Sequence, residues 1–284
     1  MWSSLVEYHR PQRMTQALRL LKWNRPRTVA LAGGTWLVAC RDPTVEAVVD
    51  LSALNLAFLE TRGGRMWLGA MTTLQSLASQ PSVGALAGGL LAEAARRSAP
   101  RAIRNMATLG GALVVGGPVD EVVLSLLAME AHVNLRTPTR QTTPLEAFLA
   151  SRSTIMPDGG LIAEVVLPGV LAKAGGALAG VGSTPRDRPI VNAAVVVVRR
   201  GVVIKSVHLA LGGVAPVPVR LPSVEAALAG VRLDEATIEE AARSVSERVT
   251  PETDWRASAA YRREMAGVVA ARALRQAWDR AAEA

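Results

Sequence analysis

The stretch "RNMATLGGALVVGGPVDE", residues 104–121, places two Gly-Gly pairs and a proline between two apolar runs. Glycine loses more conformational freedom on folding than any other residue, so clustered glycines mark either tight turns or backbone that must approach something closely. A tight turn is the commoner use of one such pair. Residues 110–111 alone therefore do not distinguish a turn from a binding site.

A similar pattern occurs near the start of the chain. "RTVALAGGTWLVA", residues 27–39, predicts a strand, a glycine loop and a short helix. "VEAVVDLS" then predicts a second strand. "MWLGAMTTLQSLA", residues 66–78, repeats the order of strand, small-residue break and helix, with Thr72 or Thr73 placed to cap that helix. Turns from strand to helix thus recur through the first half.

The rest of the chain mixes both periodicities. Helical spacing predicts one buried helix over 83–99, ending before Pro100, and another over 119–131, while 132–136 and 159–168 read as strands. Residues 190–200 and 201–213 predict an antiparallel hairpin. Amphipathic helices are expected over 222–230, 234–249 and 258–281. The fold class is therefore α+β.

Composition limits the class of protein. The 284 residues suggest about two domains, half of them are apolar, and no run of about 20 apolar residues or signal-peptide core is present. We expect a cytoplasmic protein without a transmembrane segment. The single cysteine, Cys40, excludes an internal disulfide and cannot by itself hold an iron–sulfur cluster. His9, His132 and His208 lack metal-ligand spacing, so any metal centre is expected on another chain.

The formal net charge of +8 raises the question of nucleic-acid binding. The basic residues are mostly arginines spread over the chain and mixed with acidic residues, without the interleaved aromatics of a stacking platform. We therefore expect no nucleic-acid partner. A basic rim that docks an acidic partner subunit stays open as a second interpretation.

Several motifs together resemble a known family. They are "EYHRP" (7–11), "LAGGTWL" (31–37), "LGAMTT" (68–73), "RNMATLGG" (104–111), "PVDE" (118–121), "LALGGVAPVPVR" (209–220) and "DWRASAAYRREMAGVVAARAL" (254–274). They run nearly from end to end. The chain resembles the FAD-binding medium subunit of the molybdenum hydroxylases, a family that includes aerobic carbon monoxide dehydrogenase and the flavin domain of xanthine dehydrogenase.

The resemblance implies a domain organisation. Residues 1–170 would form a two-part FAD-binding domain of mixed sheets and helices, with subdomains of about 1–54 and 55–170. Residues 171–284 would form a C-terminal α+β domain, an antiparallel sheet with helices. The glycine-rich join near 169–182 is the expected boundary.

The resemblance also implies a cofactor site. Residues 32–36, here called the first Gly-Gly segment, and residues 108–112, the second Gly-Gly segment, would be two loops that hold the FAD pyrophosphate. Physical chemistry agrees, because backbone N–H groups at turns can form an anion-binding concavity and glycine permits close approach. The candidate cofactor-binding residues are Ala32, Gly33, Gly34, Thr35, Trp36, Thr72, Thr108, Leu109, Gly110, Gly111, Ala112, Asp120, Glu121 and Leu161.

The chain departs from the family pattern at several of these positions. Polar side chains expected in and after the second Gly-Gly segment are replaced by Ala112, Val115 and Gly117. The acidic residue expected to bind the ribose or a nearby hydroxyl aligns with Glu121, and the adjacent Asp120 could substitute. Trp36 stands where a smaller polar residue is usual, and its indole could stack on the cofactor or fill an apolar gap. These changes would weaken FAD retention.

The implied role is electron transfer. FAD would receive electrons from an iron–sulfur small subunit, itself supplied by a molybdenum-cofactor large subunit, and pass them to an external acceptor. No side chain is nominated as an acid, base or nucleophile, because the cofactor performs the redox chemistry. Two alternatives stay open: a flavin-poor structural subunit of the same hetero-oligomer, and an unrelated binding module. In this family another chain selects the substrate, so the sequence identifies neither the substrate nor the electron acceptor.

Overall fold

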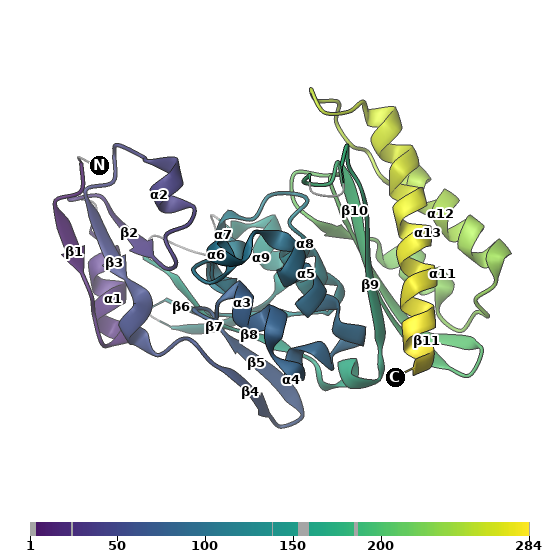
Figure 1. Cartoon of the computed structure of the whole chain (residues 1–284), viewed down its shortest axis with the longest axis horizontal. Helices are drawn as coiled ribbons and strands as arrows, with labels where there is room; N and C mark the ends of the chain where they lie inside the picture. Colours follow the sequence, from purple (N-terminus) through teal and green to yellow (C-terminus); the bar gives the residue numbers. More distant parts are fainter. Residues whose placement is uncertain (1–3, 24, 138, 153–158, 185–186, 284) are drawn as a thin grey trace. The chain divides into compact units, whose positions relative to one another are not determined.

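The computed structural model describes residues 4–23, 25–137, 139–152, 159–184 and 187–283. Helices and strands are mixed, which confirms the predicted α+β class (Figure 1). Contacts divide the chain into two compact units. The first unit comprises Met1–Ser76, Ala99–Val115 and His132–Leu167, and the second comprises Leu77–Ser98, Gly116–Ala131 and Pro168–Ala284.

The first unit begins with a small parallel sheet in the order β1-β3-β2. Its strands are β1 (Glu7–His9), β2 (Thr28–Leu31) and β3 (Ala47–Asp50), and all four residues of β3 are buried. Helix α1 (Met14–Leu21) buries one apolar face, α2 (Leu37–Cys40) follows β2, and the 3-10 helix η1 (Leu51–Leu54) follows β3. The predicted order of strand, loop and short helix over 27–39 is confirmed.

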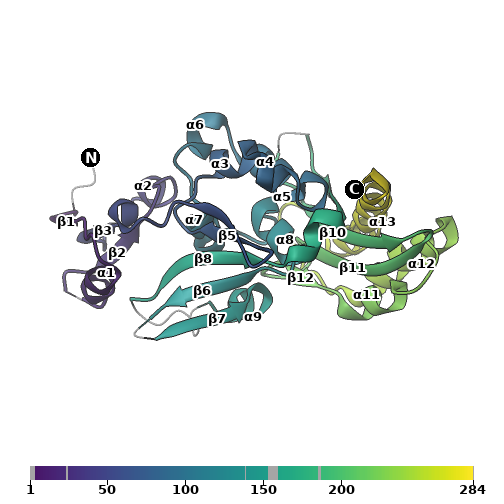
Figure 2. The same ribbon diagram turned by 90° about the horizontal axis from the view of Figure 1, so that it is seen from below.

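The same unit contains a five-stranded antiparallel sheet in the order β4-β5-β8-β6-β7 (Figure 2). The strands are β4 (Leu59–Arg62), β5 (Arg65–Gly69), β6 (His132–Arg136), β7 (Arg140–Pro144) and β8 (Leu161–Leu167). Every residue of the central strand β8 is buried. This burial explains why every residue of β8 except Glu164 is apolar. Helix α9 (Leu145–Ala150) follows β7.

Short helices follow the small-residue breaks. Helix α3 (Leu74–Ser79) begins after Thr73, whose hydroxyl oxygen accepts the Ser76 N–H at 3.1 Å, so Thr73 and not Thr72 is the cap. Helix α6 (Arg101–Arg104) precedes the second Gly-Gly segment, and α7 (Leu109–Val115) contains most of that segment. The backbone there is therefore helical.

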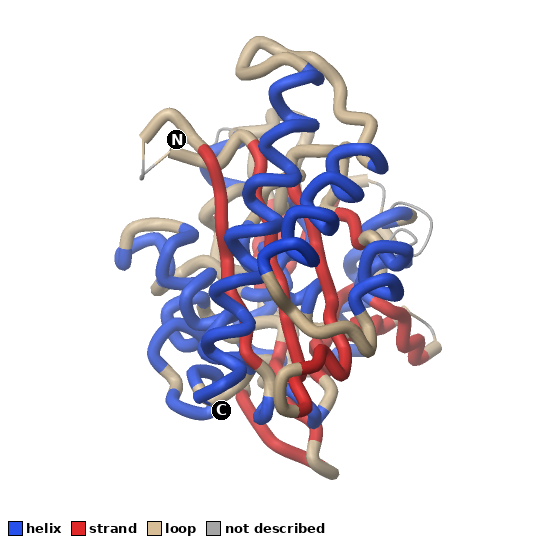
Figure 3. Tube along the Cα trace, turned by 90° about the vertical axis from the view of Figure 1, so that its right-hand side faces the viewer, coloured by secondary structure: helices blue, strands red, loops and turns tan. Residues whose placement is uncertain are grey.

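The second unit is built on a four-stranded antiparallel sheet in the order β12-β11-β10-β9. Its strands are β9 (Gly175–Val181), β10 (Val191–Arg200), β11 (Val203–Gly212) and β12 (Val219–Arg220), so the predicted hairpin is confirmed. Helices α11 (Pro222–Leu228), α12 (Glu235–Arg248) and α13 (Ala259–Glu283) supply a hydrophobic cluster with one face of this sheet. Figure 3 shows α13 running along the strands.

The other face of this sheet packs against α5 (Leu90–Ser98) and α8 (Glu121–Ala128). Alternate residues of β10 serve the two faces: Val195 and Val197 belong to the cluster with α11–α13, while Ala194 and Val196 are buried on the opposite side. The two-sided burial explains the apolar run of β10. The 3-10 helix η3 (Gly169–Lys173) precedes β9.

The prediction of one continuous helix over 83–99 is wrong. The segment divides into α4 (Pro81–Gly84), the 3-10 helix η2 (Ala87–Gly89) and α5. Gly88 and Gly89 adopt positive φ angles of 56° and 80°, which an L side chain rarely adopts and which interrupt a right-handed helix. The described residues include no helix that is both long and apolar enough to cross a bilayer.

Candidate functional site

The first Gly-Gly segment connects the end of β2 to the start of α2. Gly34 has φ of +71°, in the left-handed region, and its carbonyl accepts the Val38 N–H at 2.9 Å. A Cβ at position 34 would lie 3.4 Å from Leu31 Cδ1, so space exists there but the backbone conformation disfavours any other residue. Gly34 thus permits the left-handed turn that makes this segment a loop. The glycine loop predicted here from the sequence is confirmed.

The backbone donors of this loop have no partner among the residues that the structure describes. Within the described residues, the N–H groups of Gly33, Gly34, Thr35 and Trp36 donate no hydrogen bond, and neither does the Thr35 hydroxyl. The first three of these residues are only partly exposed. Successive N–H groups beside a left-handed residue form an anion-binding concavity, and partly buried N–H groups require some acceptor. The first Gly-Gly segment therefore offers donors suited to a phosphate.

Gly33 brings this loop against the chain just before the second Gly-Gly segment. A Cβ at position 33 would lie only 1.6 Å from the Met106 carbonyl oxygen and 2.5 Å from the Met106 carbonyl carbon. No side chain larger than hydrogen fits this approach. The two segments, far apart in sequence, are therefore neighbours within the first unit because glycine occupies position 33.

The second Gly-Gly segment is not a loop, which corrects the prediction. Residues 109–112 form the first turn of α7, and each N–H group from Leu109 to Ala112 has an acceptor in the protein. Leu109 N–H donates to the Thr72 carbonyl at 2.9 Å and Gly110 N–H to the Ala70 carbonyl at 2.8 Å. Gly111 N–H donates to Thr108 Oγ1 at 3.1 Å, and Ala112 N–H donates to the Thr108 carbonyl at 2.9 Å. These donors are already occupied.

Close packing against Ala70 favours glycine at position 110. A Cβ there would lie 3.0 Å from both the Cβ and the carbonyl oxygen of Ala70. Thr72 supports the same junction, since it is buried and its hydroxyl donates to the Phe58 carbonyl at 2.9 Å. Sequence reasoning missed Ala70 and Met106, because they act through backbone atoms. The "LGAM" break was the one signal that pointed to Ala70.

Trp36 and Leu161 have opposite environments. Trp36 is 52% exposed, so its indole does not fill an apolar gap in the described structure. Leu161 is buried in a cluster with Ala17, Leu20 and Leu21 of α1, and Ala32 packs against that cluster. The Leu161 side chain is thus a core residue, and no side-chain contact with a ligand is indicated there.

Asp120 and Glu121 lie in the second unit, where both have structural roles. Asp120 caps α8, accepting the N–H groups of Val122 and Val123 at 3.0 Å each. Burial raises the pKa of Asp120, although these two hydrogen bonds and Arg188 act in the opposite direction. Glu121 is buried and pairs with Arg97 at 3.0 Å. Burial raises the pKa of Glu121 as well, against the effect of Arg97.

The described residues contain no group of three or more His, Cys, Asp or Glu side chains placed to hold a metal ion. Cys40, at the end of α2, is exposed and unbridged.

Two family models match this chain. Residues 4–170 match the FAD binding domain in molybdopterin dehydrogenase, and residues 183–277 match the CO dehydrogenase flavoprotein C-terminal domain. The carbon monoxide dehydrogenase medium chain of Hydrogenophaga pseudoflava is 30% identical, over 97% of this chain and 98% of its own length. The glyceraldehyde dehydrogenase medium chain of Sulfolobus acidocaldarius is 27% identical, over 97% and 99%.

The fold is similar to solved structures as well. The structure of carbon monoxide dehydrogenase from Hydrogenophaga pseudoflava lacking the Mo-pyranopterin moiety of the molybdenum cofactor superposes with a TM-score of 0.89. That similarity has 31% sequence identity and covers 97% of this chain and 98% of the other. The chain therefore belongs to the FAD-binding medium subunits of the molybdenum hydroxylase oxidoreductases.

Proposed function

We propose that this chain holds the pyrophosphate of FAD at the first Gly-Gly segment and works as the electron-transfer subunit of a molybdenum-dependent dehydrogenase complex. The observation that carries this proposal is the run of backbone N–H groups from Gly33 to Trp36 that have no acceptor among the described residues. Hydrogen bonds to a charged acceptor are stronger than neutral ones. A phosphate is therefore the acceptor that these donors favour.

The two Gly-Gly segments have different duties in this proposal. The first donates N–H groups, and the Thr35 hydroxyl adds a further donor. The second provides rigid backing through α7 and its hydrogen bonds to Ala70 and Thr72. Trp36, half exposed beside the donors, is free to cover a flat ring. When bound, FAD supplies the redox chemistry, and the protein supplies position and exclusion of water.

A second candidate function, a flavin-poor structural subunit, is favoured by a specific observation. The N–H groups of residues 109–112 are occupied, and the side chains nearby are apolar or absent at Ala112, Val115 and Gly117. Val115 is 40% exposed. With fewer donors than the family pattern provides, FAD would bind weakly. The two candidates therefore differ in affinity for FAD and share the same assembly.

The partners belong to the proposal. The lack of a metal-ligand group among the described residues supports an assembly in which an iron–sulfur small subunit and a molybdenum-cofactor large subunit are separate chains. The relatives are named as medium chains of dehydrogenases, which agrees with such an assembly. Electrons would pass from the iron–sulfur chain through FAD to an external acceptor. The domain limits at 1–170 and 171–284 and the cytoplasmic location stay predictions.

The test is a titration of the purified full-length chain with FAD, following flavin fluorescence at fixed salt. We expect Gly34→Val to reduce FAD affinity at least a hundredfold, because a branched side chain both disfavours φ of +71° and covers the donors. Gly64→Val is the matched control: Gly64 has φ of +72° but lies in the β4–β5 turn, where an added Cβ meets nothing within 4 Å.

Both variants carry the same kind of backbone strain, so they should lose similar stability while only Gly34→Val loses FAD. Equal FAD affinity in wild type and Gly34→Val would overturn the assignment of the loop. An absence of FAD binding in all three proteins, with iron–sulfur and molybdenum chains still co-purifying, would favour the structural subunit.

A further inference from the structure

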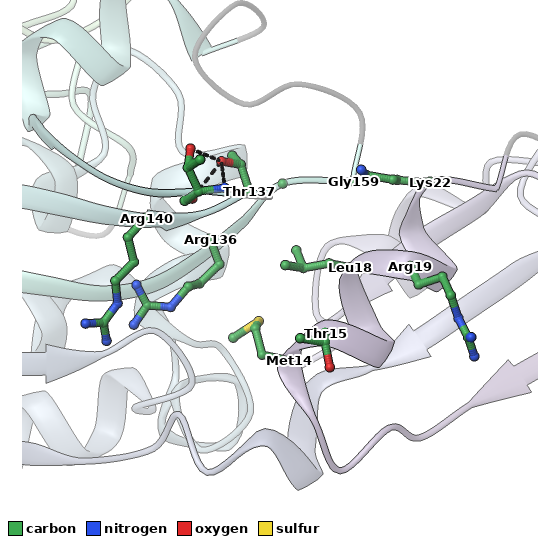
Figure 4. A pocket seen from close by; sticks show the side chains of 11 residues that line it. Met14, Thr15, Leu18, Arg19, Lys22, Arg136, Thr137, Arg140 and Gly159 are labelled. Carbon is green, nitrogen blue, oxygen red and sulfur yellow. Dashed lines mark hydrogen bonds between the residues drawn. The ribbon is translucent and has the colours of Figure 1, made fainter.

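A pocket of about 430 Å³ opens in the first unit, along one side of α1 (Figure 4). Its walls are one side of α1, the facing ends of β6 and β7, and Gly159 and Gly160 just before β8. The volume lies within the range of small-molecule sites in proteins. None of the residues 32–36 or 108–112 lines it.

The described lining residues are basic or neutral, and two arginines dominate. Arg136 and Arg140 are directly opposite each other in the β6–β7 ladder, and Figure 4 shows their guanidinium groups side by side. Like charges at opposed positions on a sheet destabilise it. Among the described residues, the carboxylate recorded near this pair is Glu164, 3.9 Å from Arg136, and it already accepts a hydrogen bond from Asn134.

A second arginine pair in the same unit shows how such a cost is normally offset. Arg62 and Arg65 are opposed in the β4–β5 ladder. There Arg62 Nε donates to Glu60 at 2.6 Å, and the Arg62 guanidinium lies 5.4 Å from the centre of the Phe58 ring. For Arg140, no carboxylate within ion-pairing distance is recorded in the described part of the chain. The positive charges of Arg136 and Arg140 are thus less neutralised by the protein than those of Arg62 and Arg65.

The lining also has an apolar part. Met14 and Leu18, both from α1, point toward Arg136 in Figure 4, while Arg19 points away. Lys22 extends toward Gly159 on the far side and adds a cation. A ligand that satisfies this lining carries a compact anion for the two guanidiniums and an apolar or aromatic group for Met14 and Leu18. Arginine forks match the oxygens of a phosphate.

We propose that this pocket is a second binding site for a phosphate monoester carried on a small organic group, of the mononucleotide class, and that Arg136 and Arg140 hold its phosphate. The site is distinct from the proposed FAD site, because none of the candidate cofactor-binding residues lines the pocket. It gives the chain a means to bind a nucleotide-like effector beside its cofactor.

The experiment is isothermal titration calorimetry on the full-length chain saturated with FAD, at fixed salt, with adenosine 5′-monophosphate, inorganic phosphate and adenosine as separate probes. The expected order of affinity is monophosphate, then inorganic phosphate, then adenosine. Arg140→Gln should weaken binding of the monophosphate by about tenfold to a hundredfold, as for loss of a hydrogen bond to a charged group. Arg65→Gln, from the neutralised arginine pair, should leave it unchanged.

Gly34→Val separates the two sites, since damage to the glycine loop should leave affinity for the monophosphate unchanged. The proposal is overturned if the monophosphate does not bind saturably, or if Arg65→Gln weakens it as much as Arg140→Gln. Inorganic phosphate binding as tightly as the monophosphate would overturn the organic part of the assignment. Loss of monophosphate binding in Gly34→Val would place the nucleotide in the FAD site and so overturn the second site.

Discussion

The two Gly-Gly segments of the first unit look alike in sequence, and each is flanked by a threonine, yet they use their backbones in opposite ways. In the first, the N–H groups from Gly33 to Trp36 have no acceptor among the described residues. In the second, the four N–H groups from Leu109 to Ala112 all donate within the protein. The first segment thus has backbone donors that a ligand could use, whereas the donors of the second segment stabilise the fold.

The cause of the difference is local. In the first segment a left-handed glycine turns successive N–H groups away from the chain's own carbonyls. In the second segment Thr108 caps a helix, and the carbonyls of Ala70 and Thr72 approach from the break after β5. A Gly-Gly pair therefore identifies close backbone approach, but the partner can be a ligand in one case and another strand end in the other.

The largest expected effect tests the structural role of the second Gly-Gly segment. Gly110→Val should destabilise the protein by roughly 3 kcal/mol, because a Cβ at this position already lies 3.0 Å from Ala70 and two further methyl groups overpack the junction. Thermal unfolding followed by circular dichroism measures this. A milder control is Gly111→Ala, whose Cβ would meet only Thr108 Oγ1 at 3.0 Å. A Gly110→Val protein as stable as wild type but unable to bind FAD would show that the second segment binds phosphate directly.

The next effect sharpens the comparison by giving the second segment side-chain donors. Ala112 and Val115 lie four and seven residues after Thr108, on one face of α7. Ala112→Asn together with Val115→Asn should raise FAD affinity by about tenfold or more, the value of one hydrogen bond to a charged oxygen. FAD titration of the double variant and wild type, at equal salt, measures the change. If the two affinities agree, the missing side chains have no part in FAD retention.

A smaller effect separates the cap from the cofactor. Thr108→Val removes the hydroxyl oxygen that accepts the Gly111 N–H, and loss of such a cap costs about 1 kcal/mol. We expect this loss in chemical denaturation and a less than threefold change in FAD affinity. Thr108→Ser retains the hydroxyl and should behave as wild type. An FAD affinity that falls tenfold in Thr108→Val and recovers in Thr108→Ser would assign the hydroxyl to the cofactor instead.

The smallest effect extends the comparison into α8. Burial raises the pKa of Glu121 above its unfolded value of about 4.3, so folding is favoured when this carboxyl is protonated, and that contribution is lost as pH rises through the folded pKa. Glu121→Gln should therefore be slightly more stable than wild type at neutral pH, and the difference should shrink toward pH 4. Unfolding midpoints over this range measure it. A loss of FAD affinity in Glu121→Gln would support the predicted ribose contact.

Sequence patterns were sufficient for elements whose residues decide their own conformation. The strand, loop and helix over 27–39, the hairpin of β10 and β11 and the three C-terminal helices follow from local periodicity and from Gly34. The broken helix over 83–99 was missed because the left-handed conformations of Gly88 and Gly89 do not alter the spacing of apolar residues. The helical state of residues 109–112 was missed because it depends on the carbonyls of Ala70 and Thr72, about 40 residues earlier in the chain.

In the candidate site, too, local sequence predicted some features, and others depended on the tertiary structure. The first Gly-Gly segment was predictable because a glycine loop after a strand carries its own signal. The structural roles of Thr72, Asp120 and Glu121 were not, since a buried hydroxyl, a helix cap and an ion pair use the same residue types as a cofactor site. The resemblance to the family pointed to these positions, and the geometry showed that their side chains have structural roles.

The packing of α5 and α8 against the sheet of the second unit has a consequence for biosynthesis. Both helices are translated before the strands that cover them, since α8 ends at Ala128 and β11 ends only at Gly212. At about 5 to 20 residues per second those 84 residues take about 4 to 17 s, during which the buried side chains of α8 have no sheet to pack on. The apolar faces of α5 and α8 therefore stay uncovered in the nascent chain until the C-terminal strands have been synthesised.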